Sequence, residues 1–201
     1  MSVGHRWVLA TSNAGKLCEL NDLLGDSGIS LVTQGSLGVT DAEETGLTFV
    51  ENALIKARHA AAATGLPALA DDSGICVDAL DGAPGLYAAR YAGTHGDSAA
   101  NNAKLLRELD GVPMDKRTAY FIAVLVVLRH ADDPAPLIAE GRWHGRILEA
   151  PRGEGGFGYD PLFLPDGHEV SAAELEVTLK NRLSHRGQAL DVLRARFAEL
   201  A

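Results

Sequence analysis

The feature that most constrains the fold is a long helical pattern that leads directly into a short apolar run. Residues 48–64 are rich in Ala and begin with Thr48-Phe49-Val50-Glu51, which matches a capping box for a helix N-terminus. After Gly65, residues 67–72 predict a strand that stops at Asp-Asp-Ser-Gly and places two acids where a sheet meets solvent. The alternative is that residues 72–74 form a simple turn, since Asp, Ser and Gly all favour turns.

The same alternation of strand and helix patterns continues along the chain. Strands are expected at residues 6–10, 31–32, 67–72, 117–129 and 137–148, with a short one after residue 161. Helices are expected at residues 17–24, 48–64, 98–109 and 184–200. Such an alternation predicts an α/β fold in one domain over residues 1–201.

Composition narrows the class of protein. With 201 residues, 46% of them hydrophobic, the chain is long enough to bury a sizeable core in one domain or in two small lobes. The formal net charge of −9 disfavours nucleic acid and acidic membrane surfaces as partners, because both attract clustered Lys and Arg. The apolar stretch near the N-terminus is too short for the core of a signal peptide. The longest apolar run, residues 119–128, is too short to span a membrane. The two cysteines, Cys18 and Cys76, lack the spacing of metal ligands, so we expect them to be buried, reduced thiols. We therefore expect a cytoplasmic protein.

Two segments carry candidate phosphate chemistry. Residues 11–16, TSNAGK, link a strand to a helix, where free N–H groups, the helix dipole and Lys16 suit a phosphate. The alternative is a helix N-cap by Ser12 or Asn13 with a solvated Lys. The second segment is acidic, and Glu44 and Asp72 are its best candidates for ligands of a divalent cation, with Asp71 next. Glu51 is assigned to the capping box, and Asp78 and Asp81 to turns or the surface.

Two further segments suit a nucleobase. In residues 155–160, GGFGYD, glycines permit close approach to a planar ligand and Phe157 offers a stacking face; the alternative is a buried Phe in a bend. Lys180, His185 and Arg186 surround the start of the last helix, where Ser184 is the expected N-cap. Cations in a first turn oppose the helix dipole, and such a local conflict indicates function rather than a solvated basic turn.

Taken together, these motifs resemble the inosine/xanthosine triphosphate pyrophosphatase family. TSNAGK, GLTFVENALIKA, ALADDSGICVDALDGAPGLYAARYAG, GGFGYDPLF and SHRGQAL occur in the family's order and cover nearly the whole chain. The resemblance implies a central twisted mixed sheet flanked by helices, two lobes with an active-site cleft, and a homodimer. It also implies Mg²⁺-dependent hydrolysis of non-standard purine nucleoside triphosphates (ITP, dITP, XTP) to the monophosphate and pyrophosphate.

The resemblance also implies roles for individual residues. Asp72 would be the general base and, with Glu44, would bind Mg²⁺. The residues that would contact the substrate are Thr11, Ser12, Asn13, Ala14, Gly15, Lys16, Lys56, Ser73, Phe157, Gly158, Tyr159, Asp160, Lys180, His185 and Arg186.

Two departures and two alternatives accompany this interpretation. Ser12 replaces the commoner Gly of the phosphate loop, and Tyr159 stands where some members have Trp. One alternative is a pyrophosphatase of the related Maf type, which acts on pyrimidine or modified nucleotides and which the SHRGQAL and GGFGYD segments oppose. The other is a non-catalytic nucleotide sensor, which the presence of both Glu44 and Asp72 opposes.

Overall fold

The computed structural model describes residues 5–11, 17, 20–21 and 28–196. The chain divides into two compact units. The first unit comprises residues 1–72, 123–141 and 186–201, and the second comprises residues 73–122 and 142–185. No helix in the described part of the chain is long and apolar enough to cross a membrane.

The described residues form one seven-stranded sheet in the order β2-β1-β3-β5-β6-β7, with β4 paired to β3. The strands are β1 (His5–Leu9), β2 (Ile29–Thr33), β3 (Ala68–Val77), β4 (Pro84–Gly85), β5 (Thr118–Leu128), β6 (Leu137–Ile147) and β7 (Phe163–Pro165). β1 pairs in parallel with β2 and β3, whereas β4 on β3 and β7 on β6 are antiparallel. The predicted mixed sheet of an α/β fold is therefore confirmed.

Among the described residues, the α-helices with defined bounds are α2 (Phe49–Thr64), α3 (Ser98–Glu108), α4 (Val177–Leu183) and α5 (His185–Ala195). Thr48 caps α2 by accepting a hydrogen bond from the Glu51 N–H, as the sequence predicted, and Asp97 caps α3 by accepting one from the Ala100 N–H. α4 was not predicted. α5 begins after Ser184 as expected and ends at Ala195, while residues 197–200 of the expected helix lie outside the described residues.

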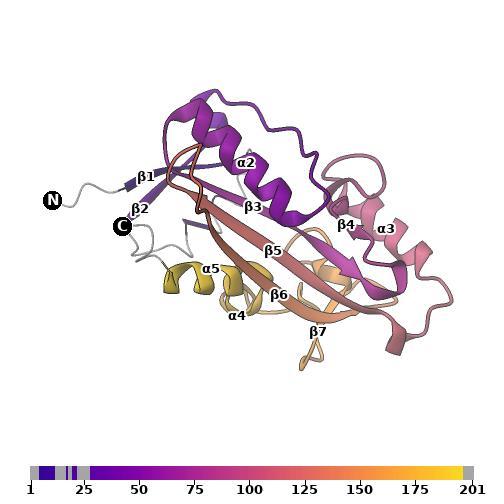
Figure 1. Cartoon of the computed structure of the whole chain (residues 1–201). Coiled ribbons are helices and arrows are strands. Elements are labelled where there is room, and N and C mark those ends of the chain that lie inside the picture. Colours follow the sequence, from indigo (N-terminus) through magenta and orange to yellow (C-terminus); the bar gives the residue numbers. More distant parts are fainter. Residues whose placement is uncertain (1–4, 12–16, 18–19, 22–27, 197–201) are drawn as a thin grey trace. The chain divides into compact units, whose positions relative to one another are not determined.

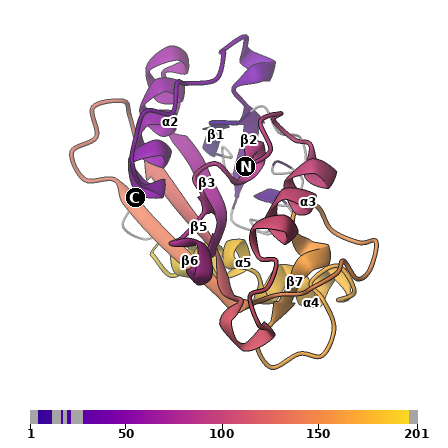
Figure 2. The ribbon, with the colours of Figure 1, turned by 90° about the vertical axis from the view of Figure 1, so that its right-hand side faces the viewer.

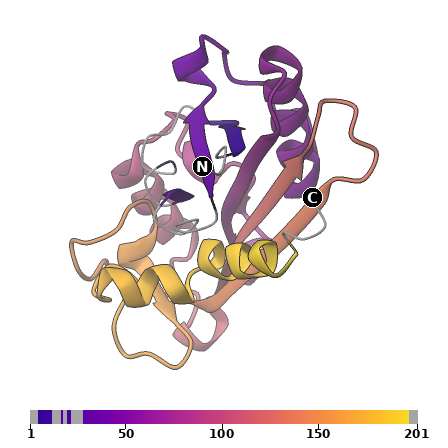
Figure 3. The ribbon, with the colours of Figure 1, turned by 90° about the vertical axis from the view of Figure 1, so that its left-hand side faces the viewer.

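The core of the first unit lies on the sheet face covered by α5. It contains Trp7, Leu9 and Leu69 of neighbouring strands, and α5 adds Ala189, Leu190 and Leu193. Side chains alternate between the faces of a strand, so Val8 and Ala70, which are also fully buried, point the other way. Figures 1 and 3 show α2 on that other face, where its Ala-rich side permits close packing.

The second unit has its own core. Its members are buried side chains from β3, α3, β5, β6 and the segment after residue 158, among them Ile75, Leu105, Phe121, Ile147 and Phe163. Within this unit α3 lies beside the segment that carries residues 155–165 (Figure 2), and Asn102 Nδ2 donates to the Gly158 carbonyl at 3.0 Å. Of the leucines at the C-terminal end of this helix, Leu105 and Leu109 are completely buried, whereas Leu106 is half-buried and packs against the same core.

β3 does not stop at Asp-Asp-Ser-Gly, as the sequence had indicated, but continues to Val77. Asp71 and Asp72 are therefore buried in the middle of a strand, and the alternative of a turn at residues 72–74 is also wrong. The continuation is explained by Ile75 and Val77, which are completely buried in the core of the second unit. Burial of these two β-branched side chains outweighs the weak strand preference of the Ser-Gly pair before them.

Candidate active site

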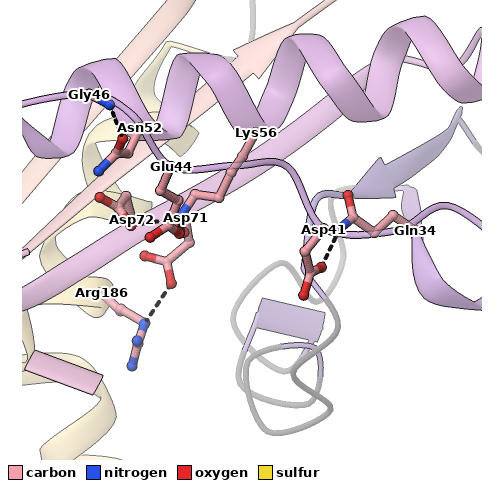
Figure 4. A network of polar contacts seen from close by, with 9 residues as sticks. All are labelled: Gln34, Asp41, Glu44, Gly46, Asn52, Lys56, Asp71, Asp72 and Arg186. Carbon is pink, nitrogen blue, oxygen red and sulfur yellow. Dashed lines mark hydrogen bonds and ion pairs between the residues drawn. The ribbon is translucent and has the colours of Figure 1, made fainter. Parts of the chain in front are cut away.

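Lys56 of α2 lies at the centre of a group of oxygen atoms in the first unit (Figure 4). Its Nζ donates to Asp72 Oδ1 at 2.6 Å, to the Asp71 carbonyl at 2.9 Å and to Glu44 Oε1 at 3.2 Å. α2 supplies the cation, β3 supplies both Asp residues, and the loop before α2 supplies Glu44. The structure thus brings together three residues, Glu44, Lys56 and Asp72, that the sequence singled out from separate segments.

The charges of this group shift each other's protonation. Burial alone would lower the pKa of Lys56, but the carboxylates of Asp72, Asp71 and Glu44 raise it above its ordinary value. Burial raises the pKa of Asp72, and the neighbouring Lys56 opposes this shift only in part. Lys56 therefore stays protonated, and Asp72 is a better proton acceptor than an exposed Asp.

Asp71 forms an ion pair with Arg186, the second cation of this site. Arg186 Nε donates to Asp71 Oδ2 at 3.3 Å, and the two side chains are only 4% and 1% exposed (Figure 4). The ion pair offsets the unfavourable position of Arg186 in the first turn of α5. The alternative of a solvated basic turn is wrong at this residue, because its guanidinium is buried.

The loop that carries Glu44 is attached to the first turns of α2. Asn52 Oδ1 accepts a hydrogen bond from the Gly46 N–H at 2.8 Å, and Glu51 Oε2 accepts one from the Leu47 N–H at 2.9 Å. Asn52 is a residue of the site that sequence reasoning missed. The signal was its position four residues before Lys56, which places both side chains on one face of a helix.

In the second unit, residues 155–160 present an exposed aromatic ring. Phe157 is 58% exposed, so the alternative of a buried Phe is wrong. Asp160 Oδ2 accepts from the Phe157 N–H at 2.7 Å and from Lys180 Nζ at 2.6 Å. Lys180 Nζ also lies 5.0 Å from the centre of the Phe157 ring. A Cβ at Gly156 would collide with the Asp160 carboxylate, so this turn requires glycine.

The neighbours of Phe157 are more deeply placed. The Tyr159 ring belongs to the core of the second unit and its hydroxyl donates to the Ala88 carbonyl at 2.8 Å. Burial raises the pKa of this Tyr. His185 is buried and stacks on Phe121, with 4.9 Å between ring centres. Ser73 is half-buried on β3.

Some predicted residues lie outside the described part of the chain. These are Ser12, Asn13, Ala14, Gly15 and Lys16. Thr11, at the start of the same loop, lies two residues after the end of β1, and its N–H donates to the Leu9 carbonyl at 2.8 Å.

The other acids are placed as the sequence predicted. Glu51 accepts from the Thr48 hydroxyl in the capping box. Asp78 is exposed and accepts from the Thr118 hydroxyl, and Asp81 occupies a left-handed turn position with φ 52°. Within the described residues, no three His, Cys, Asp or Glu side chains form a metal-binding group. Glu44 and Asp72 are nevertheless two carboxylates directed at one cation.

Comparisons with known proteins agree with this arrangement of motifs. The sequence pattern of the Ham1 family matches residues 7–196. A dITP/XTP pyrophosphatase of Xanthomonas campestris is 61% identical over 96% of this chain and 98% of its own length. One from Shigella flexneri is 58% identical over 92% and 94%. The structure of a HAM1 protein from Coxiella burnetii superimposes with a TM-score of 0.91 at 49% identity and covers 97% of this chain and 99% of its own. The chain therefore belongs to the Ham1 family.

Proposed function

We propose that this protein hydrolyses non-standard purine nucleoside triphosphates, ITP, dITP and XTP, to the monophosphate and pyrophosphate. The observation that carries the proposal is the convergence of Glu44, Lys56 and Asp72 in a chain whose relatives are named dITP/XTP pyrophosphatases. Neither Maf-type pyrophosphatase activity nor a non-catalytic sensor accounts for that combination.

In this proposal Asp72 accepts a proton from the water that attacks the α-phosphorus, and the bond to the bridging oxygen breaks as pyrophosphate leaves. Lys56 binds only one oxygen of the Asp72 carboxylate, and the other oxygen, Oδ2, has no hydrogen-bond partner among the described residues. The raised pKa of Asp72 supports this role, because a general base works best when its pKa is near the working pH. Lys56 and the loop of residues 11–16 would hold the triphosphate.

Mg²⁺ is the proposed cofactor, and Glu44 and Asp72 are its proposed ligands. The atoms that surround the Lys56 ammonium are all oxygens, two of them from carboxylates, and this donor set fits a hard divalent cation. When bound, Mg²⁺ would neutralise charge on the phosphate oxygens.

For the base, Phe157 would provide the stacking face, and Gly158, Tyr159, Asp160, Lys180, His185 and Arg186 would recognise its edge, with Ser73 a further substrate contact. Hypoxanthine and xanthine carry a 6-keto acceptor where adenine carries an amino donor. A cationic donor directed at that position would pair with the first two bases and face a donor in the third. A buried polar group left unpaired costs about 1–3 kcal/mol, which is enough to discriminate between them.

The setting of the enzyme is also part of the proposal. We expect a homodimer in the cytoplasm that folds as one domain over residues 1–201, with a substrate cleft and without nucleic acid or membrane partners. The net charge of −9 and the buried free thiol of Cys76 support this setting.

The test is a turnover screen of common and deaminated nucleoside triphosphates, with and without Mg²⁺, in which pyrophosphate and orthophosphate are measured separately. The proposal requires Mg²⁺-dependent release of pyrophosphate from ITP, dITP and XTP, with little from ATP or GTP. Release of orthophosphate alone, preference for pyrimidine nucleotides, or binding without turnover would each contradict it.

A further inference from the structure

Glu44 lies on a stretch without regular secondary structure, between the short helical turn Gly35–Leu37 and the start of α2. A carboxylate on such a stretch needs other contacts to fix its position. The backbone contact nearest to Glu44 on its C-terminal side is the hydrogen bond from the Gly46 N–H to Asn52 Oδ1, at 2.8 Å (Figure 4). Asn52 is 2% exposed, so water does not compete for this bond.

The loop passes very close to α2 at this point. A Cβ built on Gly46 would lie 2.6 Å from the Glu51 Cβ and 2.7 Å from Asn52 Oδ1, so there is no room for a larger residue. The Leu47 N–H, one residue on, is bound by Glu51. The backbone two and three residues after Glu44 is therefore held against the first turns of the helix.

Asn52 and Lys56 hold this loop in different ways. They lie four residues apart on α2, and Asn52 binds the backbone whereas Lys56 binds the Glu44 carboxylate itself at 3.2 Å. Lys56 shares its ammonium with Asp72 and Asp71, and in the proposed function it also contacts phosphate. Asn52 Oδ1 accepts from the Gly46 N–H, so this bond holds the backbone of the loop without involving a charged group of the site.

We propose that Asn52 is a positioning residue that fixes Glu44 for binding of the divalent cation. The inference rests on the proposed function, in which Glu44 is a ligand. Asn52 acts through the Gly46 amide and not by contact with the cation. Gly46 contributes to the same positioning, because only a glycine lets the loop pass this close to α2. Partners that orient a metal ligand in this way typically contribute about 10–100-fold to metal affinity or activity.

The test compares Asn52→Leu with Asn101→Leu. Asn101 is a matched control: it is also a buried helical Asn, and its Oδ1 accepts from a backbone N–H, that of Ala92, at 2.7 Å. Binding of Mn²⁺ to the substrate-free proteins is measured by electron paramagnetic resonance, and the exchange rate of the Gly46 amide by NMR. Asn52→Leu is expected to lower Mn²⁺ affinity about tenfold and to accelerate exchange at Gly46. Asn101→Leu should lower the melting temperature but leave both readouts as in the parent.

Two more variants keep the test decisive if Asn52→Leu does not fold. Gly46→Ala leaves Asn52 intact but forces the loop away, and it should weaken Mn²⁺ binding to a similar extent. Asn52→Asp retains the acceptor and should keep the slow exchange of the Gly46 amide. Parent-like Mn²⁺ affinity in both Asn52→Leu and Gly46→Ala, or an equal loss in Asn101→Leu, would overturn the inference.

Glu44→Gln separates this inference from the function on which it rests. If Glu44→Gln lowers Mn²⁺ affinity and the Asn52 and Gly46 variants do not, the positioning role is wrong while the metal ligand stands. If Glu44→Gln leaves Mn²⁺ affinity unchanged, the proposed ligand and the positioning role both fail.

Discussion

The protonation of single residues in the candidate site depends on burial and on the charged groups beside them. Asp72 is the clearest case: Lys56 Nζ donates to its Oδ1 at 2.6 Å, and burial nevertheless raises the pKa of the Asp72 carboxyl. Asp72→Asn keeps the shape but removes the proton acceptor, and we expect kcat to fall about 10²–10⁴-fold. Pyrophosphate release from ITP measures it. Asp78→Asn, the same change at an exposed Asp of the turn after β3, should leave kcat near the parent value; near-normal turnover of Asp72→Asn would refute the assignment.

Arg186 gives a second prediction at this scale. If its guanidinium donates to the 6-keto oxygen, Arg186→Ala should lower kcat/KM for ITP and XTP by roughly 10- to 150-fold while ATP turnover stays as poor as before. Arg129→Ala is the control, because it also removes an Arg–Asp ion pair, at 2.7 Å to Asp133, outside the candidate site. An unchanged ratio of ITP to ATP turnover in Arg186→Ala would assign Arg186 to structure or to phosphate binding.

At the scale of elements, the connection between β5 and β6 depends on one carboxylate. Asp133 is 1% exposed; it accepts from the Arg129 guanidinium at 2.7 and 2.9 Å and from the N–H groups of Arg129 and Ala135, both at 3.0 Å. The hydrogen bonds from Arg129 hold the pKa of Asp133 well below its usual range. Its ionised form therefore stabilises the folded state above the pKa of an unfolded Asp, about 3.9, and this contribution is lost as the pH falls further.

Asp133→Asn tests this prediction. The variant should melt at a lower temperature than the parent near pH 7, and the difference should shrink as the pH falls below about 4. Thermal melts of both proteins across this range measure the difference. A gap that does not change with pH would mean that the charge of Asp133 contributes nothing to stability.

At the scale of the whole molecule, β3, β5 and β6 each contribute residues to both units. Leu125 of β5 lies in the core of the first unit and Ile147 of β6 in the core of the second, and both are completely buried. We expect Leu125→Ala and Ile147→Ala each to destabilise the protein by about 2–5 kcal/mol. Because the strands are continuous, each variant should shift a single transition in calorimetry. Two separate transitions in either variant would show that the units unfold independently.

Much of the fold could be predicted because its signals are local. The capping box at Thr48 and the Ala-rich helix that follows it need only neighbours within one or two turns, and they were predicted correctly. α4 was missed because it has only seven residues, and its two leucines at helical spacing, Leu179 and Leu183, are too short a pattern to predict a helix. Among the site residues, an acid such as Asp72 could be predicted from its residue type, because carboxylates bind cations and accept protons. The residue type of Asn52 indicates no such role.

The sequence by itself determined the family, the α/β class and the residue types of the site, because motifs and hydrophobic periodicity depend only on the order of residues along the chain. Only the tertiary structure decided that β3 continues past Asp72, that Lys56 lies among three oxygens, and that Arg186 is paired with Asp71. Each of these depends on segments far apart in the chain. Arg186 and Asp71 are separated by 115 residues, and no local preference encodes how a buried charge finds its partner over such a separation.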